Sequence, residues 1–130
     1  MVDENDAPDE QLVELAHQMF DLARAGAAEQ LEAYVEAGVP VDLTDAAGNT
    51  LLMLAAYHGH AETVTMLARC GADVDRLNDR GQSPLAGAVF KDEPEVVAAL
   101  LDAGADPDKG GPTARETAAV FGRAELFGKG

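Results

Sequence analysis

The side chains of this sequence that could do chemistry are three histidines and one cysteine. His17, His58 and His60 are the only imidazoles, and Cys70 is the only thiol. Imidazole and thiolate are common zinc ligands, and together they can act as base and nucleophile. No histidine is spaced with Cys70 or with carboxylates as a metal site requires. We therefore interpret Cys70 and His60 as structural residues.

Two pairs of aspartates offer the oxygen ligands that calcium prefers. Asp73 and Asp75 form one pair, and Asp106 and Asp108 form the other, with the same spacing. Calcium takes about six to eight oxygen ligands, and neither segment supplies the remaining ones. With no catalytic cluster of any other kind, the sequence predicts a protein that is not an enzyme and needs no cofactor or metal.

The composition indicates one acidic, globular unit. The 130 residues are 47% hydrophobic, and 24 Asp and Glu outnumber nine Lys and Arg for a net charge of −15. This charge argues against binding to nucleic acid or to an anionic membrane surface. Residues 1–44 alone carry −10, whereas residues 111–130 carry +1. The acidic excess is therefore concentrated toward the N-terminus.

The lone cysteine and the N-terminal sequence predict a cytoplasmic location. One cysteine excludes an internal disulfide, which fits a reducing compartment. The first ten residues are acidic and lack the basic start and apolar run of a secretory signal. No stretch approaches the roughly 20 apolar residues that span a bilayer.

The chain repeats itself at a fixed period. The segment from Asp45 to Asn78 matches the segment that follows it at a constant offset. The matched pairs include Gly48 with Gly81, Thr50 with Ser83, Leu52 with Leu85, and Leu67 with Leu100. The Gly-Ala-Asp triplet at 71–73 likewise matches the triplet at 104–106. A fixed period in this range is typical of solenoids built from stacked repeats.

Helices must position these residues, and their limits follow from periodicity, capping residues and glycines. A first helix is predicted from Asp9 until Gly26 ends it, and a second covers about residues 27–37. The buried face of the first helix is expected to carry Leu12, Leu15, Ala16, Met19, Phe20 and Ala23. Thr50 and Ser83 are expected to cap the first helices of the central repeats. We predict a flexible acidic segment at 1–8 and one domain at 9–127, with repeats at about 9–44, 45–77, 78–110 and 111–127.

Two irregularities interrupt the pattern. Asp92 stands where the preceding repeat has Gly59, so we expect it to adopt a left-handed backbone conformation. The step from Ser83 to Thr113 is three positions shorter than the step from Thr50 to Ser83, so the intervening loop has lost three residues. The last helix, at 124–127, has room for barely one turn. Terminal repeats are commonly atypical because one face meets water.

The repeat resembles the ankyrin-repeat family. The resemblance rests on Gly48-Asn49-Thr50, Ala55-Ala56, Gly59-His60 and the two Gly-Ala-Asp triplets. The family's Thr-Pro-Leu-His motif is incomplete, since the copy with proline reads Ser83-Pro84-Leu85-Ala86. The resemblance implies an all-α ankyrin-repeat solenoid of about four helix-turn-helix repeats, joined by β-turn or hairpin-like fingers, with degenerate terminal caps.

The resemblance also implies where a partner is bound, at finger tips and at the exposed ends of the first helices. On the fingers these positions are Ala46, Ala47, Asn49, Asp79, Arg80 and Gln82. On the helices they are Tyr57 with His58, Phe90 with Lys91, and Val120 with Phe121. The other reading is that Tyr57 and Phe90 only cover neighbouring repeats. Phe121, next to the short cap, is interpreted as a packing residue.

Three kinds of function are compatible with these residues. The resemblance favours a non-catalytic protein-protein interaction module, a scaffold or regulator whose concave face holds a partner. The net charge favours a partner with a basic face, and we expect a monomer. The alternatives are an enzyme or small-ligand sensor with a site in the groove, and a structural protein that assembles end to end.

Overall fold

The computed structural model describes residues 10–128 of the chain. The acidic segment predicted at 1–8 and the helix start predicted at Asp9 lie outside the described residues. The described part contains seven α-helices, one short 3-10 helix, and one isolated bridge between Thr44 and Thr50. The elements are α1 (Glu10–Ala25), α2 (Ala28–Glu36), α3 (Leu51–Tyr57), α4 (Ala61–Arg69), α5 (Pro84–Phe90), α6 (Pro94–Asp102), α7 (Ala114–Phe121) and η2 (Ala124–Phe127).

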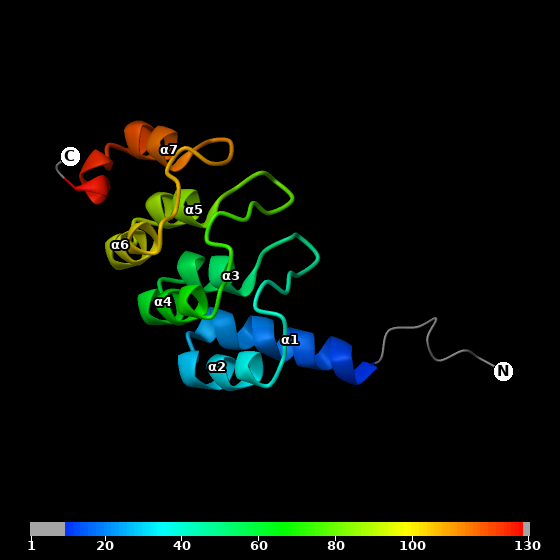
Figure 1. The fold of residues 1–130 in the computed structure, drawn as a ribbon. Helices are drawn as coiled ribbons and strands as arrows, with labels where there is room; N and C mark the ends of the chain where they lie inside the picture. The colour runs from blue at the N-terminus through cyan, green and yellow to red at the C-terminus, as the bar shows by residue number, and fades with distance from the viewer. Residues whose placement is uncertain (1–9, 129–130) are drawn as a thin grey trace.

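The helices form two layers of a stack (Figure 1). The first helices of the pairs, α1, α3, α5 and α7, each contact the next, and so do the second helices, α2, α4, α6 and η2. The loops before α3, α5 and α7 extend to the same side of the stack as fingers. The prediction of an all-helical solenoid of about four pairs is confirmed. No helix within residues 10–128 is both long and apolar enough to cross a membrane.

Hydroxyl side chains cap the N-termini of three of the first helices, α3, α5 and α7. The hydroxyls of Thr50 and Ser83 accept hydrogen bonds from the backbone N–H groups of Met53 and Ala86, at 3.1 and 3.0 Å. At α7 the cap is reciprocal: Thr113 accepts from the N–H of Glu116, and the Glu116 carboxylate accepts from the N–H of Thr113. These caps satisfy N–H groups that have no partner inside a helix. The caps predicted at Thr50 and Ser83 are therefore confirmed.

A left-handed residue ends the first helices. Gly59 follows α3 with φ 83°, and Asp92 follows α5 with φ 57°. Asp92 is the one described residue other than glycine with a positive φ. The prediction that it takes the backbone position of Gly59 is confirmed.

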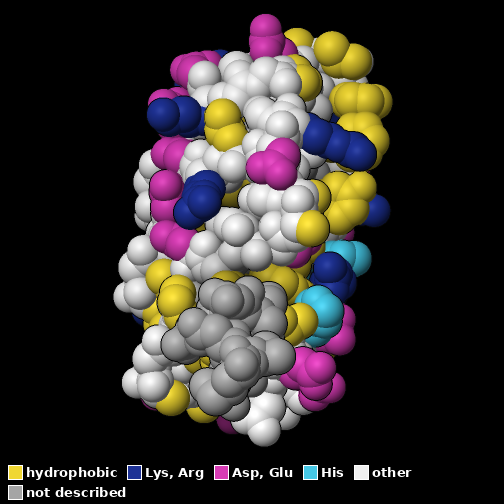
Figure 2. Space-filling view, turned by 90° about the vertical axis from the view of Figure 1, so that its right-hand side faces the viewer, with side chains coloured by type: hydrophobic (Ala, Val, Ile, Leu, Met, Phe, Trp, Pro, Cys, Tyr) yellow, Lys and Arg dark blue, Asp and Glu magenta, His cyan; other side chains and the backbone are white. Residues whose placement is uncertain are grey.

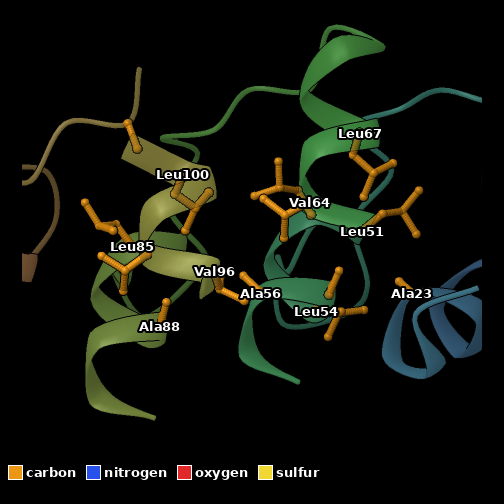
Figure 3. Close-up of a cluster of buried hydrophobic side chains, with 14 of the residues drawn as sticks. Ala23, Leu51, Leu54, Ala56, Val64, Leu67, Leu85, Ala88, Val96 and Leu100 are labelled. Carbon is orange, nitrogen blue, oxygen red and sulfur yellow. The ribbon is translucent and has the colours of Figure 1, made fainter. Parts of the chain in front are cut away.

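The core repeats with the helices (Figure 3). Leu51, Val64 and Leu67 fill the space between α3 and α4, and Leu85 with Leu100 does the same between α5 and α6. Small residues on the first helices, such as Ala23, Ala56 and Ala88, are fully buried as well. Apolar burial of about 1.5–3 kcal/mol for each large side chain holds the stack together.

The first helix differs from its prediction at its N-terminal end. Leu12 was expected on the buried face but is 63% exposed. With 16 residues against seven in α3, the helix α1 extends past the neighbour on which it packs. Met19, Phe20 and Ala23, which lie farther along the same face, are buried as expected. The periodicity was therefore correct, but the neighbour that would cover Leu12 is too short.

Candidate functional site

A groove of about 550 Å³ lies along the layer of first helices, between the fingers and the helices α3, α5 and α7. Its helix side is largely apolar and comes from α3, α5 and α7. The lining residues used below are Leu54, Tyr57, Gly87, Phe90, Val120 and Phe121. The finger side contributes polar residues, among them Asn49, Asn78, Arg80 and Gln82.

Two aromatic rings, one repeat apart, line the groove and remain open to solvent. Tyr57 is 41% exposed and Phe90 is 51% exposed. The Phe90 ring meets the Phe121 ring edge-on, with centroids 5.5 Å apart. The Lys91 Nζ lies 4.8 Å from the centroid of the Tyr57 ring, which is cation–π distance. Figure 2 shows hydrophobic side chains gathered in a column along one edge of the molecule, with Lys, Arg and His side chains beside it.

The groove is widened next to Tyr57 by a glycine inside a helix. Gly87 of α5 occupies the position that Leu54 has in α3, one repeat earlier. A Cβ at Gly87 would meet one atom within 4 Å, the Tyr57 Cδ1, at an ordinary 3.7 Å. The fold therefore does not need glycine there, and a helix-interior glycine costs about 0.5–1 kcal/mol relative to alanine.

The polar side chains of the fingers are used to hold the fingers in place. The Asn78 Nδ2 donates to the Asn49 Oδ1 at 3.0 Å and to the Gln82 Oε1 at 2.9 Å. The Asn78 Oδ1 accepts from the backbone N–H groups of Arg80 and Gln82. The N–H of Asp79 donates to the Ala47 carbonyl at 3.0 Å, which joins one finger to the next. The polar side of the groove is therefore held in place by these hydrogen bonds.

His60 and His58 have different roles. The His60 Nε2 lies 2.7 Å from the Arg24 carbonyl oxygen at the end of α1. Because a carbonyl only accepts, Nε2 must carry the proton, and His60 joins the first two repeats as the structural residue it was predicted to be. Burial, and then His60, Arg24 and Lys91, lower the pKa of His58 below its ordinary value. His58 lies beside the groove, with its ring edge-on to Tyr57.

Arg123 repeats the contact of His60 at the other end of the stack. Its guanidinium donates to the carbonyls of Val89 and Phe90, at 2.9 and 2.6 Å, at the end of α5. Cys70 is half-buried, with its Sγ 3.8 Å from the Met66 Sδ. Among residues 10–128, no three His, Cys, Asp or Glu side chains lie together in a way that could hold a metal ion. The groove residues themselves offer apolar contact, ring stacking and charge.

The predicted site residues divide into two groups. Seven line the groove: Asn49, Tyr57, Arg80, Gln82, Phe90, Val120 and Phe121. Five do not line it: Ala46, Ala47, His58, Asp79 and Lys91. Lys91 and His58 still contact the Tyr57 ring, whereas Ala47 and Asp79 contribute to the link between fingers.

Sequence reasoning missed several lining residues, of which Met53, Gly87 and Glu116 are examples. Gly87 carried a visible signal, since it breaks the leucine pattern when the two central repeats are aligned. Phe121, interpreted as a packing residue, both contacts Phe90 and lines the groove.

The stack of helix pairs, the fingers and the groove between them define a helical-repeat protein. Comparison with known sequences identifies the family: a family model described as ankyrin repeats, with three copies, matches residues 19–110. The chain belongs to the ankyrin-repeat family, whose members are generally protein-protein interaction modules. It is also 52% identical, over 48 residues, to a Pseudomonas aeruginosa protein named as an ankyrin repeat protein. That match covers 37% of this chain and 28% of the relative.

Proposed function

We propose that the chain is a non-catalytic interaction module that binds the apolar side chains of a partner protein in its groove. The observation that carries the proposal is Gly87, which leaves the groove open beside Tyr57 although a side chain would fit. Helix stability is reduced at a position where packing does not require it. A binding role for the open space explains that cost.

The exposed rings support the same proposal. Large aromatic side chains that are about half exposed bury much area on binding and lose little rotamer entropy. Tyr57 and Phe90 are of this kind and lie on the same groove. Their helices are held by other residues, such as Leu52 and Leu85, which are fully buried.

A double substitution separates binding from packing. Tyr57→Ala with Phe90→Ala should abolish capture of partner proteins from the source cells, while the melting temperature changes little. The matched control is Leu12→Ala with Val13→Ala, which truncates two exposed apolar residues of α1 outside the groove. Capture is measured by mass spectrometry, and stability by circular dichroism. Loss of stability with capture intact in the folded fraction would show that the rings serve packing.

The proposal also covers the location of the chain, its oligomeric state and the charge of its partner. We propose a cytoplasmic location, supported by the single cysteine, which leaves no internal disulfide to form. We also propose that the chain is a monomer. A basic face on the partner is supported by the net charge of −15 and concerns surfaces outside the groove. No particular observation favours a catalytic site or end-to-end assembly.

A further inference from the structure

Resting on the proposed interaction at the groove, we infer that the segment which enters it is an acidic peptide, with carboxylate side chains next to its apolar ones. This inference runs opposite to what the net charge of the chain suggests. It follows from the charges that lie at the groove itself.

The groove lining contains one cation and one carboxylate. Arg80 is the one Lys or Arg among the lining residues, and Glu116 is the one Asp or Glu. The Glu116 carboxylate already accepts from the N–H of Thr113 at 2.8 Å in the cap of α7. Arg80 takes part in neither of the ion pairs found among residues 10–128, which are Arg24–Asp21 and Arg115–Asp108. Its guanidinium is thus available to a carboxylate, for which its planar fork of donors is suited.

A second cation stands at the helix side. The Lys91 Nζ is held over the Tyr57 ring and, like Arg80, is in neither ion pair of the described residues. Its sequence neighbours Asp92 and Glu93 are acidic; the Glu93 carboxylate lies against Gly59. A carboxylate that approached Lys91 would meet the ammonium above an aromatic surface.

Two cations, Arg24 and Lys91, lie close enough to His58 to contribute, after burial and His60, to the lowering of its pKa. Of these, Arg24 is paired with Asp21. Of the nine Lys and Arg of the chain, Arg80 lines the groove, Lys91 lies over the Tyr57 ring, and the Arg123 guanidinium lies against the Phe121 ring. Arg80 and Lys91, which are in neither ion pair of the described residues, thus offer charge complementarity to the carboxylates of an acidic ligand.

A library of short random peptides displayed on phage tests the inference directly. Peptides selected on the full chain should be rich in Asp or Glu beside Leu, Phe or other apolar residues. Synthetic versions are then titrated by fluorescence anisotropy. Arg80→Glu with Lys91→Glu should weaken their binding by about tenfold or more. Arg76→Glu with Lys109→Glu, which changes the net charge equally outside the groove, should change binding by less than about twofold.

The possible results test the acidic ligand and the proposed protein-binding function separately. Selected peptides that are basic or uncharged, and that lose binding to Tyr57→Ala with Phe90→Ala, would overturn the acidic ligand and leave the groove as a protein-binding site. Acidic peptides that bind both charge-reversed variants equally would also overturn it. No enriched peptides, or peptides insensitive to the Tyr57 and Phe90 substitutions, would overturn both. Circular dichroism melts confirm that each variant is folded.

Discussion

Asp92 shows how a single residue can keep a repeat intact without the usual glycine. A left-handed conformation costs most residues about 1–2 kcal/mol, and Asp less because its side chain can bond locally. Asp92→Gly should therefore be neutral or stabilise the fold by up to about 1 kcal/mol, a gain limited by the entropy that glycine adds to the unfolded chain. Urea unfolding measures the difference. A fall of several degrees in melting temperature would reveal a stabilising contact of the Asp92 side chain.

Gly59→Val is the matched change in the preceding repeat. Valine is β-branched and poorly suited to φ 83°, and its Cβ would lie 2.7 Å from the Glu93 carboxylate. We expect a loss of about 2 kcal/mol or more. A loss as small as that of a surface substitution would contradict the left-handed requirement at this position.

His60 and Glu93 occupy equivalent positions in successive repeats, but only His60 is hydrogen-bonded to a carbonyl of the preceding repeat. His60→Ala removes the contact to Arg24 at the first repeat junction and should cost about 1–2 kcal/mol. Glu93→Ala removes no hydrogen bond of this kind and serves as the control, with an expected cost below about 1 kcal/mol from the lost charge at the start of α6. Equal losses in urea unfolding would show that His60 contributes only packing.

At the scale of the element, Gly87 lowers the stability of α5 and leaves the groove open beside Tyr57. Gly87→Ala should raise the free energy of unfolding by about 0.5–1 kcal/mol, because the added methyl meets only the Tyr57 ring. Gly87→Leu copies Leu54 of α3, so it should keep the fold while its larger side chain fills the groove and blocks binding. Thermal unfolding and peptide titration measure the two effects separately. A destabilising Gly87→Ala would mean that the helix has a packing reason for its glycine.

The helices themselves were predictable because their causes are local. Thr50, Ser83 and Gly59 act within a few residues of where they stand, and the position of Asp92 follows from the repeat. The exposure of Leu12 was not predictable in this way, because it depends on how far the neighbouring helix extends. The groove could not be predicted for the same reason. Gly87 is visible as an exception in the sequence, but its role depends on which face of α5 meets the fingers.

Over the whole molecule, the net charge of −15 acts at longer distances than Arg80 in the groove and Lys91 beside it. Charges farther apart than a Debye length, about 10 Å at 0.1 M salt, are largely screened, whereas a carboxylate in contact with Arg80 is screened less. An acidic ligand is therefore repelled during its approach and attracted once it is bound. The repulsion during approach follows from the net charge of the chain, and the attraction in the complex follows from the residues at the site.

This difference makes the association rate of an acidic groove peptide rise with salt. Between about 0.01 and 0.1 M salt the Debye length falls from about 30 to 10 Å, which screens the repulsion between the peptide and the acidic chain. Stopped-flow fluorescence should record an increase of about two- to fivefold. The variant Arg76→Glu with Lys109→Glu, more negative outside the groove, should steepen this increase and leave the dissociation rate unchanged. A rate that instead falls with salt would show that the acidic peptide is attracted during its approach, so that Arg80 and Lys91 outweigh the net charge of the chain at long range as well.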